Sequence, residues 1–168
     1  MYTIISGTNR PGSNTLKVAK EYQRLLTSKG IENALLTLEG INLLKRDAAF
    51  EKMENDILIP ASKFLIIAPE YNGSFPGALK MLIDNSKISA SWWHKKALLT
   101  GVATGRAGNL RGMEHLSGVL NYLKITVFPN LLPISVVDKL LDANGKFTDE
   151  ATLEVINSQI DQFIAWGN

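Results

Sequence analysis

The stretch 64-FLIIAPEYNGSFPGALKMLIDN-85 contains a strand, a polar loop and a helix in direct succession. Residues 64–68 are all apolar, which is typical of a central parallel strand that helices cover on both faces. Pro76 begins a helical pattern, and Ser74 is the expected N-cap of that helix. A buried strand that leads straight into a helix is the repeating unit of an α/β fold.

The same alternation continues in both directions from this stretch. Four more strands are expected, the fifth interrupted by two prolines: residues 2–6, 34–38, 97–102, and 125–128 with 134–137. Apolar residues at helical spacing predict helices near residues 16–26, 47–60, 113–123 and 153–164, the last with a cap and an acid at Thr148-Asp149-Glu150. The pattern predicts one α/β domain over residues 1–168, with a five-stranded, doubly wound parallel sheet and helices on both faces.

The composition excludes several kinds of site. The chain has 168 residues, a formal net charge of +2 and no cysteine. Without cysteine there are no disulfides, no thiolate catalysis and no Cys-ligated clusters, and His94 and His115 lack a metal-binding spacing. We therefore expect no metal site. The small net charge argues against a nucleic-acid surface. No signal peptide and no apolar run of about 18–20 residues is visible, so we expect a cytoplasmic protein without membrane contact.

Three polar loops follow strands of the predicted sheet: loop 1 (residues 7–13), loop 2 (69–75) and loop 3 (104–109). In doubly wound sheets, ligands bind outside the carboxyl ends of the strands. All three loops are rich in small and polar residues and belong to that edge. Their agreement predicts one ligand site there.

Loop 1 lies within 6-SGTNRPGSNT-15 and precedes a helix. The free N–H groups and the dipole of a helix N-terminus favour an anion, and Arg10 can add a charged contact. The stretch has neither a P-loop lysine nor a G-x-G-x-x-G pattern, which disfavours an ATPase and a dinucleotide loop. Two interpretations remain from these residues: a phosphate cradle, or a helix that Ser13 or Asn14 simply caps.

Loops 2 and 3 carry weaker signals. Tyr71 and Phe75 can stack on or contact a flat ligand, and the glycines of loop 3 permit a close backbone approach. The alternative for both loops is an ordinary turn. The adjacent Trp92 and Trp93 can cover a ligand, join a subunit contact or pack beneath the sheet.

The stretches SGTNRPGSNT, PEYNGSFPGALKMLIDN and TGRAGNLRGMEHL, in this order, resemble the NADPH-dependent FMN reductases of the flavodoxin-like fold, a family that includes azo-dye, quinone and chromate reductases. The resemblance implies a three-layer flavodoxin-like sandwich with strand order 2-1-3-4-5. It also implies non-covalently bound FMN, NADPH or NADH as co-substrate, a small-molecule electron acceptor, and a homodimer or homotetramer.

The resemblance further implies roles for particular residues. The FMN phosphate would be held by Thr8, Arg10, Ser13, Asn14 and Thr15. The flavin ring would be lined by Pro69, Glu70, Tyr71, Asn72 and Gly73, with Thr104, Gly105, Arg106 and Gly108 at its other edge. Hydride transfer to a flavin needs no side-chain acid or base, so no catalytic residue is expected. One departure stands out: many members have paired glycines where this chain has Gly108-Asn109.

Two other functions fit a flavin-binding chain. One is a flavodoxin-type module that carries single electrons between proteins, although such modules are usually acidic and this chain is slightly basic, with a pI near 8.8. The other is a flavin-binding regulator with little turnover. Direct reduction of bound flavin by NADPH distinguishes the reductase from both.

Overall fold

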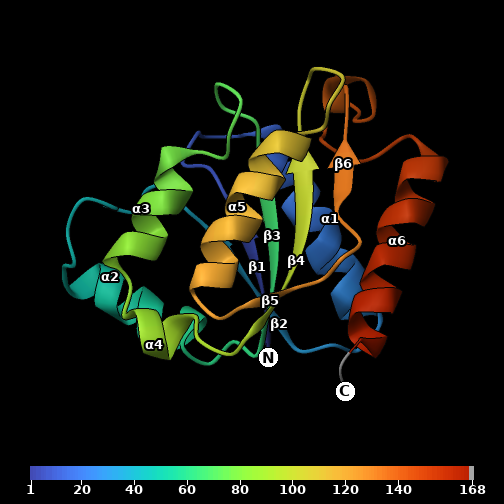
Figure 1. Cartoon of the computed structure of the whole chain (residues 1–168). Helices are drawn as coiled ribbons and strands as arrows, with labels where there is room; N and C mark the ends of the chain where they lie inside the picture. Colours follow the sequence, from blue (N-terminus) through green and yellow to red (C-terminus); the bar gives the residue numbers. More distant parts are fainter. Residues whose placement is uncertain (167–168) are drawn as a thin grey trace.

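The computed structural model describes residues 1–166 and shows a parallel sheet between two layers of helices (Figure 1). The elements in chain order are β1 (Tyr2–Ser6), α1 (Asn14–Ser28), β2 (Asn33–Thr37), α2 (Ala48–Met53), the π-helical η1 (Glu54–Leu58), β3 (Lys63–Pro69), α3 (Gly77–Asn85), α4 (Ile88–Ser91), β4 (Lys96–Val102), α5 (Leu110–Tyr122), β5 (Thr126–Val127), β6 (Leu132–Ile134), the 3-10 turn η2 (Val137–Lys139) and α6 (Glu150–Ala165). Within the described part of the chain, no helix is both long and apolar enough to cross a membrane.

The strands pair in the order β2-β1-β3-β4-β5, and every pair is parallel. This confirms the predicted flavodoxin-like order 2-1-3-4-5. β3 lies at the centre of the sheet: it pairs with β1 from Lys63 to Ile67 and with β4 from Lys63 to Pro69. Because all strands point the same way, the loops after β1, β3 and β4 emerge at one edge, which we call the carboxyl edge.

The predicted break in the fifth strand is confirmed, but the bounds of its second piece were wrong. β5 and β6 pair with opposite ends of β4. The second piece is β6, which contains Pro133, whereas Val137 lies in the turn η2. An edge strand tolerates proline because one side of its backbone has no strand to pair with.

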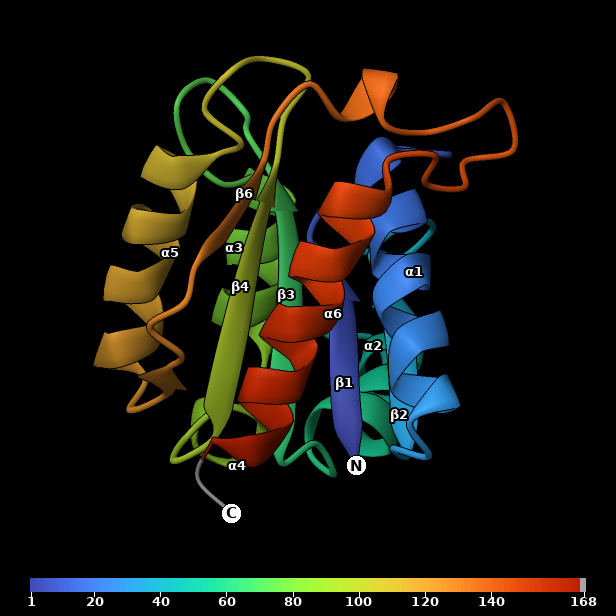
Figure 2. The same cartoon turned by 90° about the vertical axis from the view of Figure 1, so that its right-hand side faces the viewer.

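Each face of the sheet has its own core. Along β3, Phe64, Ile66 and Ala68 belong to one buried cluster, and Leu65 and Ile67 belong to the other. The helices α1 and α6 cover the second face, while α2, α3, α4 and α5 lie over the first (Figure 2). The continuous apolar run of β3 follows from this double covering.

Side-chain caps begin several helices. The hydroxyl of Ser13 accepts a hydrogen bond at the start of α1, and the carboxylate of Asp149 does so at the start of α6, as predicted. The predicted cap of α3 was wrong. That helix begins after Pro76 without a side-chain cap, and Ser74 instead lies in a tight hairpin, where its hydroxyl hydrogen-bonds His115 Nδ1 at 3.0 Å.

The two adjacent tryptophans precede β4, at the opposite edge of the sheet from the three loops. Trp92 is fully buried, and its ring centroid lies 4.9 Å from that of Phe64, so it packs beneath the sheet. Trp93 is 39% exposed, and Lys124 Nζ lies 3.8 Å from its ring centroid. Neither side chain lies near the carboxyl edge of its own chain.

A buried carboxylate joins η1 to its neighbours. Glu54 is fully buried; its Oε2 accepts a hydrogen bond from Arg46 Nη2 at 2.7 Å. Its Oε1 accepts one from Ser91 Oγ at 2.9 Å and another from the Lys87 amide. Burial disfavours the charged form, but these donors and the guanidinium charge outweigh it and hold the pKa of Glu54 below its usual range.

Replacing this carboxylate tests its contribution to the fold. We expect Glu54→Gln to lower the free energy of unfolding at pH 7 by about 1–3 kcal/mol, because buried donors lose their partner. The folded pKa lies below the unfolded value, so the contribution is complete above about pH 4.3 and is lost as the pH falls through the folded pKa. The gap between variant and wild type, measured by urea unfolding, should therefore narrow in acid.

A matched control lies on the same segment. The carboxylate of Asp56 is exposed and pairs with Lys52 on the surface, so Asp56→Asn should change stability little at any of these pH values. A stability gap for Glu54→Gln that widens in acid would contradict the assignment.

Candidate functional site

The three polar loops meet at the carboxyl edge around a cavity of about 250 Å³. Its walls come from the start of α1, the end of β3 and the end of β4. The lining residues are Arg10, Pro11, Ser13, Asn14, Thr15, Pro69, Glu70, Tyr71, Val102, Ala103, Thr104 and Val137. Segments about 60 and 30 residues apart in the chain thus form one site, as parallel strands require.

The N-terminus of α1 forms one wall. Ser13 Oγ accepts a hydrogen bond from the Leu16 amide at 3.1 Å, so Ser13 caps the helix. A hydroxyl group can still donate its own hydrogen to an anion while it accepts this bond. The amides of Asn14 and Thr15 lie in the first turn, where helix geometry supplies no acceptor within the helix. Capping and anion binding are therefore compatible in this loop.

Two side-chain contacts connect loop 1 to loop 2, and both involve Tyr71. Thr8 is buried, and its hydroxyl lies 2.6 Å from the Tyr71 hydroxyl in a hydrogen bond. The Arg10 guanidinium lies 4.2 Å from the centroid of the Tyr71 ring, a cation–π contact, while the rest of the Arg10 side chain is exposed. The cation is thus held at the mouth of the cavity.

Loop 2 is a two-residue hairpin. The backbones of Tyr71 and Ser74 exchange two hydrogen bonds, of 2.8 and 3.1 Å. The central residues Asn72 and Gly73 have φ values of 51° and 80°, which matches the Asn-Gly preference of a type I′ turn. Asn72 projects to solvent at the tip, so the hairpin holds Tyr71 in place beside the cavity.

Loop 3 is packed against β6. Gly108 has a φ of 52°, and a Cβ on it would lie 2.6 Å from Pro133 Cβ. Gly105 lines a second hollow of about 200 Å³ beside Glu70 and Thr104. The Arg106 side chain is exposed. The loop is therefore tightly packed at its buried end and exposed at its tip.

Several lining residues carry no signal in the sequence. Val102 is the last residue of β4, and Ala103 follows it. Val137 is the first residue of η2, and its amide donates a hydrogen bond to the Ala103 carbonyl at 3.1 Å. Val136 adopts a φ of 45°, an unusual conformation for a β-branched residue, and its amide donates to the Gly105 carbonyl. Such strain is often found at functional sites. Only the tertiary structure brings this segment to loop 3.

The structure thus brings together many, but not all, of the residues that the resemblance implies. Those that line the cavity are Arg10, Ser13, Asn14, Thr15, Pro69, Glu70, Tyr71 and Thr104. Those at the same edge but outside its lining are Thr8, Asn72, Gly73, Gly105, Arg106 and Gly108. Thr8 and Gly108 are buried and support the loops from behind, whereas Arg106 and Asn72 are exposed.

The donors of the cavity fit a mononucleotide phosphate. One wall offers first-turn amides, hydroxyls and a guanidinium, which are the groups that bind phosphate at helix N-termini. The first turn of α1 contains no acidic residue that would repel it. The other two walls present backbone next to Tyr71 and small side chains, which suits a flat ring, and they also include the carboxylate of Glu70.

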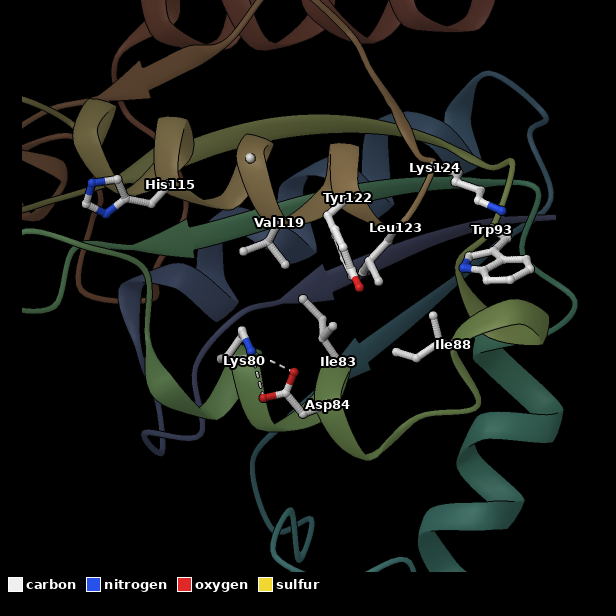
Figure 3. Close-up of a pocket in the computed structure, with 11 residues that line it drawn as sticks. Lys80, Ile83, Asp84, Ile88, Trp93, His115, Val119, Tyr122, Leu123 and Lys124 are labelled. Atoms are coloured by element: carbon white, nitrogen blue, oxygen red, sulfur yellow. Dashed lines mark hydrogen bonds and ion pairs between the residues drawn. The ribbon is translucent and has the colours of Figure 1, made fainter.

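A larger hollow of about 790 Å³ lies away from the carboxyl edge, between α3 and α5. Figure 3 shows Ile83 on α3 facing Val119 on α5 and Leu123 just after it, with Trp93 at one end and His115 at the other. We call this hollow the α3–α5 groove. Its lining is mainly apolar, with Lys80 and Asp84 paired at 2.7 Å on its rim.

The sheet order defines a flavodoxin-like fold, and the carboxyl-edge cavity lies where proteins of this fold bind their ligands. Within that fold class, the model of the NADPH-dependent FMN reductase family matches residues 2–137, and the chain belongs to this family of oxidoreductases.

Two relatives and one solved structure illustrate the similarity. An NAD(P)H-dependent FMN reductase of Pseudomonas aeruginosa is 30% identical over 173 aligned positions, which cover 96% of this chain and 92% of the relative. A 2-hydroxy-1,4-benzoquinone reductase of a Burkholderia species is 32% identical over 111 positions, 63% of this chain and 60% of the relative. The flavoenzyme NAD(P)H:(acceptor) oxidoreductase FerB of Paracoccus denitrificans has the same fold: its TM-score is 0.80, with 23% identity, 98% of this chain covered and 95% of that one.

Two glycines of loop 3 form a matched pair for testing its packing. Gly108→Ala should lower the free energy of unfolding by about 2–4 kcal/mol, because it combines a left-handed backbone with a steric clash against Pro133. Gly105→Ala should change stability little, since no atom lies within 4 Å of the added Cβ. Thermal unfolding of both variants measures the difference; equal effects would show that loop 3 does not pack against β6 in this way.

Proposed function

We propose that this protein binds FMN non-covalently at the carboxyl edge and passes hydride from NADPH or NADH to small-molecule acceptors such as flavins, quinones, azo compounds or metal oxyanions. The observation that carries the proposal is the single cavity that joins the N-terminus of α1 to the walls made by loops 2 and 3. Family membership and relatives named FMN reductase and quinone reductase support it.

In this proposal the phosphate lies at the start of α1. The amides of Asn14 and Thr15 and the hydroxyl of Ser13 point donors at it, and the helix dipole adds a favourable field. Arg10 supplies the positive charge from the mouth of the cavity. Thr8 acts indirectly, since its hydrogen bond to Tyr71 holds loop 1 against loop 2.

The ring lies along loops 2 and 3. Pro69, Glu70 and Tyr71 provide one side, with the hairpin tip of Asn72 and Gly73 beyond them. Thr104, Gly105 and Arg106 lie at the other side, and the buried Gly108 supports them from behind. When bound, FMN accepts a hydride and passes the electrons to the acceptor. The protein's task is to position the ring, to leave one face open, and to present backbone N–H groups where negative charge develops.

One substitution separates phosphate binding from helix capping. Aspartate caps a helix as well as serine does, so Ser13→Asp should leave α1 and the fold stable. Its carboxylate would face the phosphate of FMN and repel it. We expect the dissociation constant of FMN to rise about tenfold or more, measured by fluorescence titration of the protein with FMN.

Riboflavin and a second cap are the controls for this variant. Riboflavin has no phosphate, so Ser13→Asp should leave its affinity unchanged. The reverse exchange, Asp149→Ser at the cap of α6, should affect neither flavin. Unchanged FMN affinity in Ser13→Asp would mean that Ser13 serves only as the cap of α1.

The assembly that the resemblance implies can be placed on the α3–α5 groove. Tyr122 on its rim is 86% exposed and Trp93 is 39% exposed, a costly arrangement for aromatic residues in water. Tyr122 and the groove lie on the same surface. In a two-fold dimer, the Tyr122 ring of each copy can therefore enter the groove of the other copy. We propose a homodimer through this groove. A homotetramer would need a second surface.

A charge placed on the rim of the groove tests the dimer. Tyr122→Asp should convert a dimeric protein to a monomer without loss of stability, because the side chain is exposed within the chain. Val155→Asp is the control, since Val155 is 49% exposed on α6 at the other face of the sheet. Sedimentation velocity measures both. A wild type that is monomeric at micromolar concentrations, or a dimeric Tyr122→Asp, would contradict the proposal.

A further inference from the structure

Asn109 is a buried polar residue in the wall between loops 2 and 3. It is the residue before α5, it is fully buried, and its backbone is left-handed, with φ 64° and ψ 30°. Apart from glycine, asparagine is among the residues that adopt this conformation most readily. An asparagine therefore fits this backbone and places one buried amide side chain at the end of loop 3.

This side chain joins loop 3 to the start of loop 2. Asn109 Nδ2 donates to the carbonyl of Ala68 at 2.9 Å and to the carbonyl of Pro69 at 3.0 Å. An amide nitrogen has two hydrogens, so both are used. The amide of Glu70 donates in turn to the carbonyl of Val102 at 3.1 Å. The end of β3 is thus held to β4 and to loop 3 at the point where it enters the cavity wall.

Two neighbouring glycines leave the space that this side chain needs. A Cβ on Gly112 would lie 2.0 Å from Asn109 Oδ1. A Cβ on Gly101 would lie 3.1 Å from Asn109 Cβ and 2.0 Å from the carbonyl oxygen of Gly108. The asparagine therefore occupies a space fitted to it between β4 and α5.

The side chain also has a cost. Asn109 Oδ1 is buried and has no hydrogen-bond partner in the structure. A buried acceptor without a partner is destabilising, and such groups are uncommon in folded proteins. The two hydrogen bonds from Nδ2 stabilise the fold and offset this loss. Both end on backbone carbonyls at the proposed cofactor site.

We propose that Asn109 is a positioning residue that fixes loop 2 relative to loop 3 and thereby sets the shape of the flavin-ring half of the site. The inference rests on the proposed function. The proposed ring walls are Pro69 to Tyr71 on one side and Val102 to Thr104 on the other. The two hydrogen bonds from Asn109 Nδ2, which we call the clamp, end on the carbonyls of Ala68 and Pro69, at the start of the first wall. Neither hydrogen bond of the Asn109 side chain reaches α1, whose N-terminus forms the proposed phosphate wall. Asn109 therefore acts on ring binding and leaves phosphate binding unchanged.

Two flavins and three variants test this division. Asn109→Gly keeps the left-handed backbone and removes the clamp. It should weaken FMN and riboflavin by the same factor, about tenfold, so that the ratio of their dissociation constants stays at the wild-type value. Ser13→Asp should change that ratio, because it affects FMN alone. His94→Gly removes another left-handed side chain, at the opposite edge of the sheet, and should change neither affinity.

Asn109→Asp gives a second and independent measurement. It keeps the shape of the side chain, but its carboxylate faces two carbonyl oxygens and cannot donate to them. A protonated carboxyl group donates one hydrogen bond, so the affinity for both flavins, relative to wild type, should recover as the pH falls from 8 to 5. This partial rescue would not occur if Asn109 only filled space.

The outcomes are distinct. Unchanged affinity for both flavins in Asn109→Gly, or a loss confined to FMN, would overturn the positioning role. If Asn109→Gly does not fold, the absence of recovery at low pH in Asn109→Asp overturns it. A wild-type protein that takes up neither flavin would overturn the proposed function, and this role with it.

Discussion

The parallel pairing of β1, β3 and β4 is the constraint on which the site depends. Because these strands point the same way, loops that are far apart in sequence emerge together. Helices must then cover both faces, which requires β3 to be apolar on both sides. The same constraint delivers the N-terminus of α1 to the carboxyl edge, with its free amides directed at the cavity. The fold and the proposed anion site thus have one physical origin.

The capping role of Ser13 in loop 1 is compatible with the binding role that we propose for it. Ser13 satisfies the Leu16 amide as a cap, yet the first-turn amides beside it stay available. A helix N-terminus binds an anion only if the helix is well formed up to its first residue. Capping by Ser13 would therefore support the proposed phosphate site as well as the helix itself.

Much of the fold could be predicted from the sequence, because apolar periodicity and glycine and proline positions are local signals. Strand order and the convergence of the loops follow from such signals and from the rules of parallel sheets. The N-cap of α3 could not be predicted, since Ser74 is taken up by an Asn-Gly hairpin and by His115 on a distant helix. Within the site, Val137 was missed because nothing local marks it. The departure at Asn109 was visible in the sequence, but its clamp on β3 appears only when loops 2 and 3 are seen together.

The central claim is that the carboxyl-edge cavity holds FMN in a form that a nicotinamide cofactor can reduce. The most direct test is the visible spectrum of the FMN-loaded protein, recorded without oxygen before and after addition of NADPH or NADH. The account predicts that the protein retains FMN through gel filtration and that the oxidised flavin absorbance is lost on addition of one equivalent of reductant. A protein that takes up no FMN, or whose bound FMN stays oxidised with both cofactors, would contradict it.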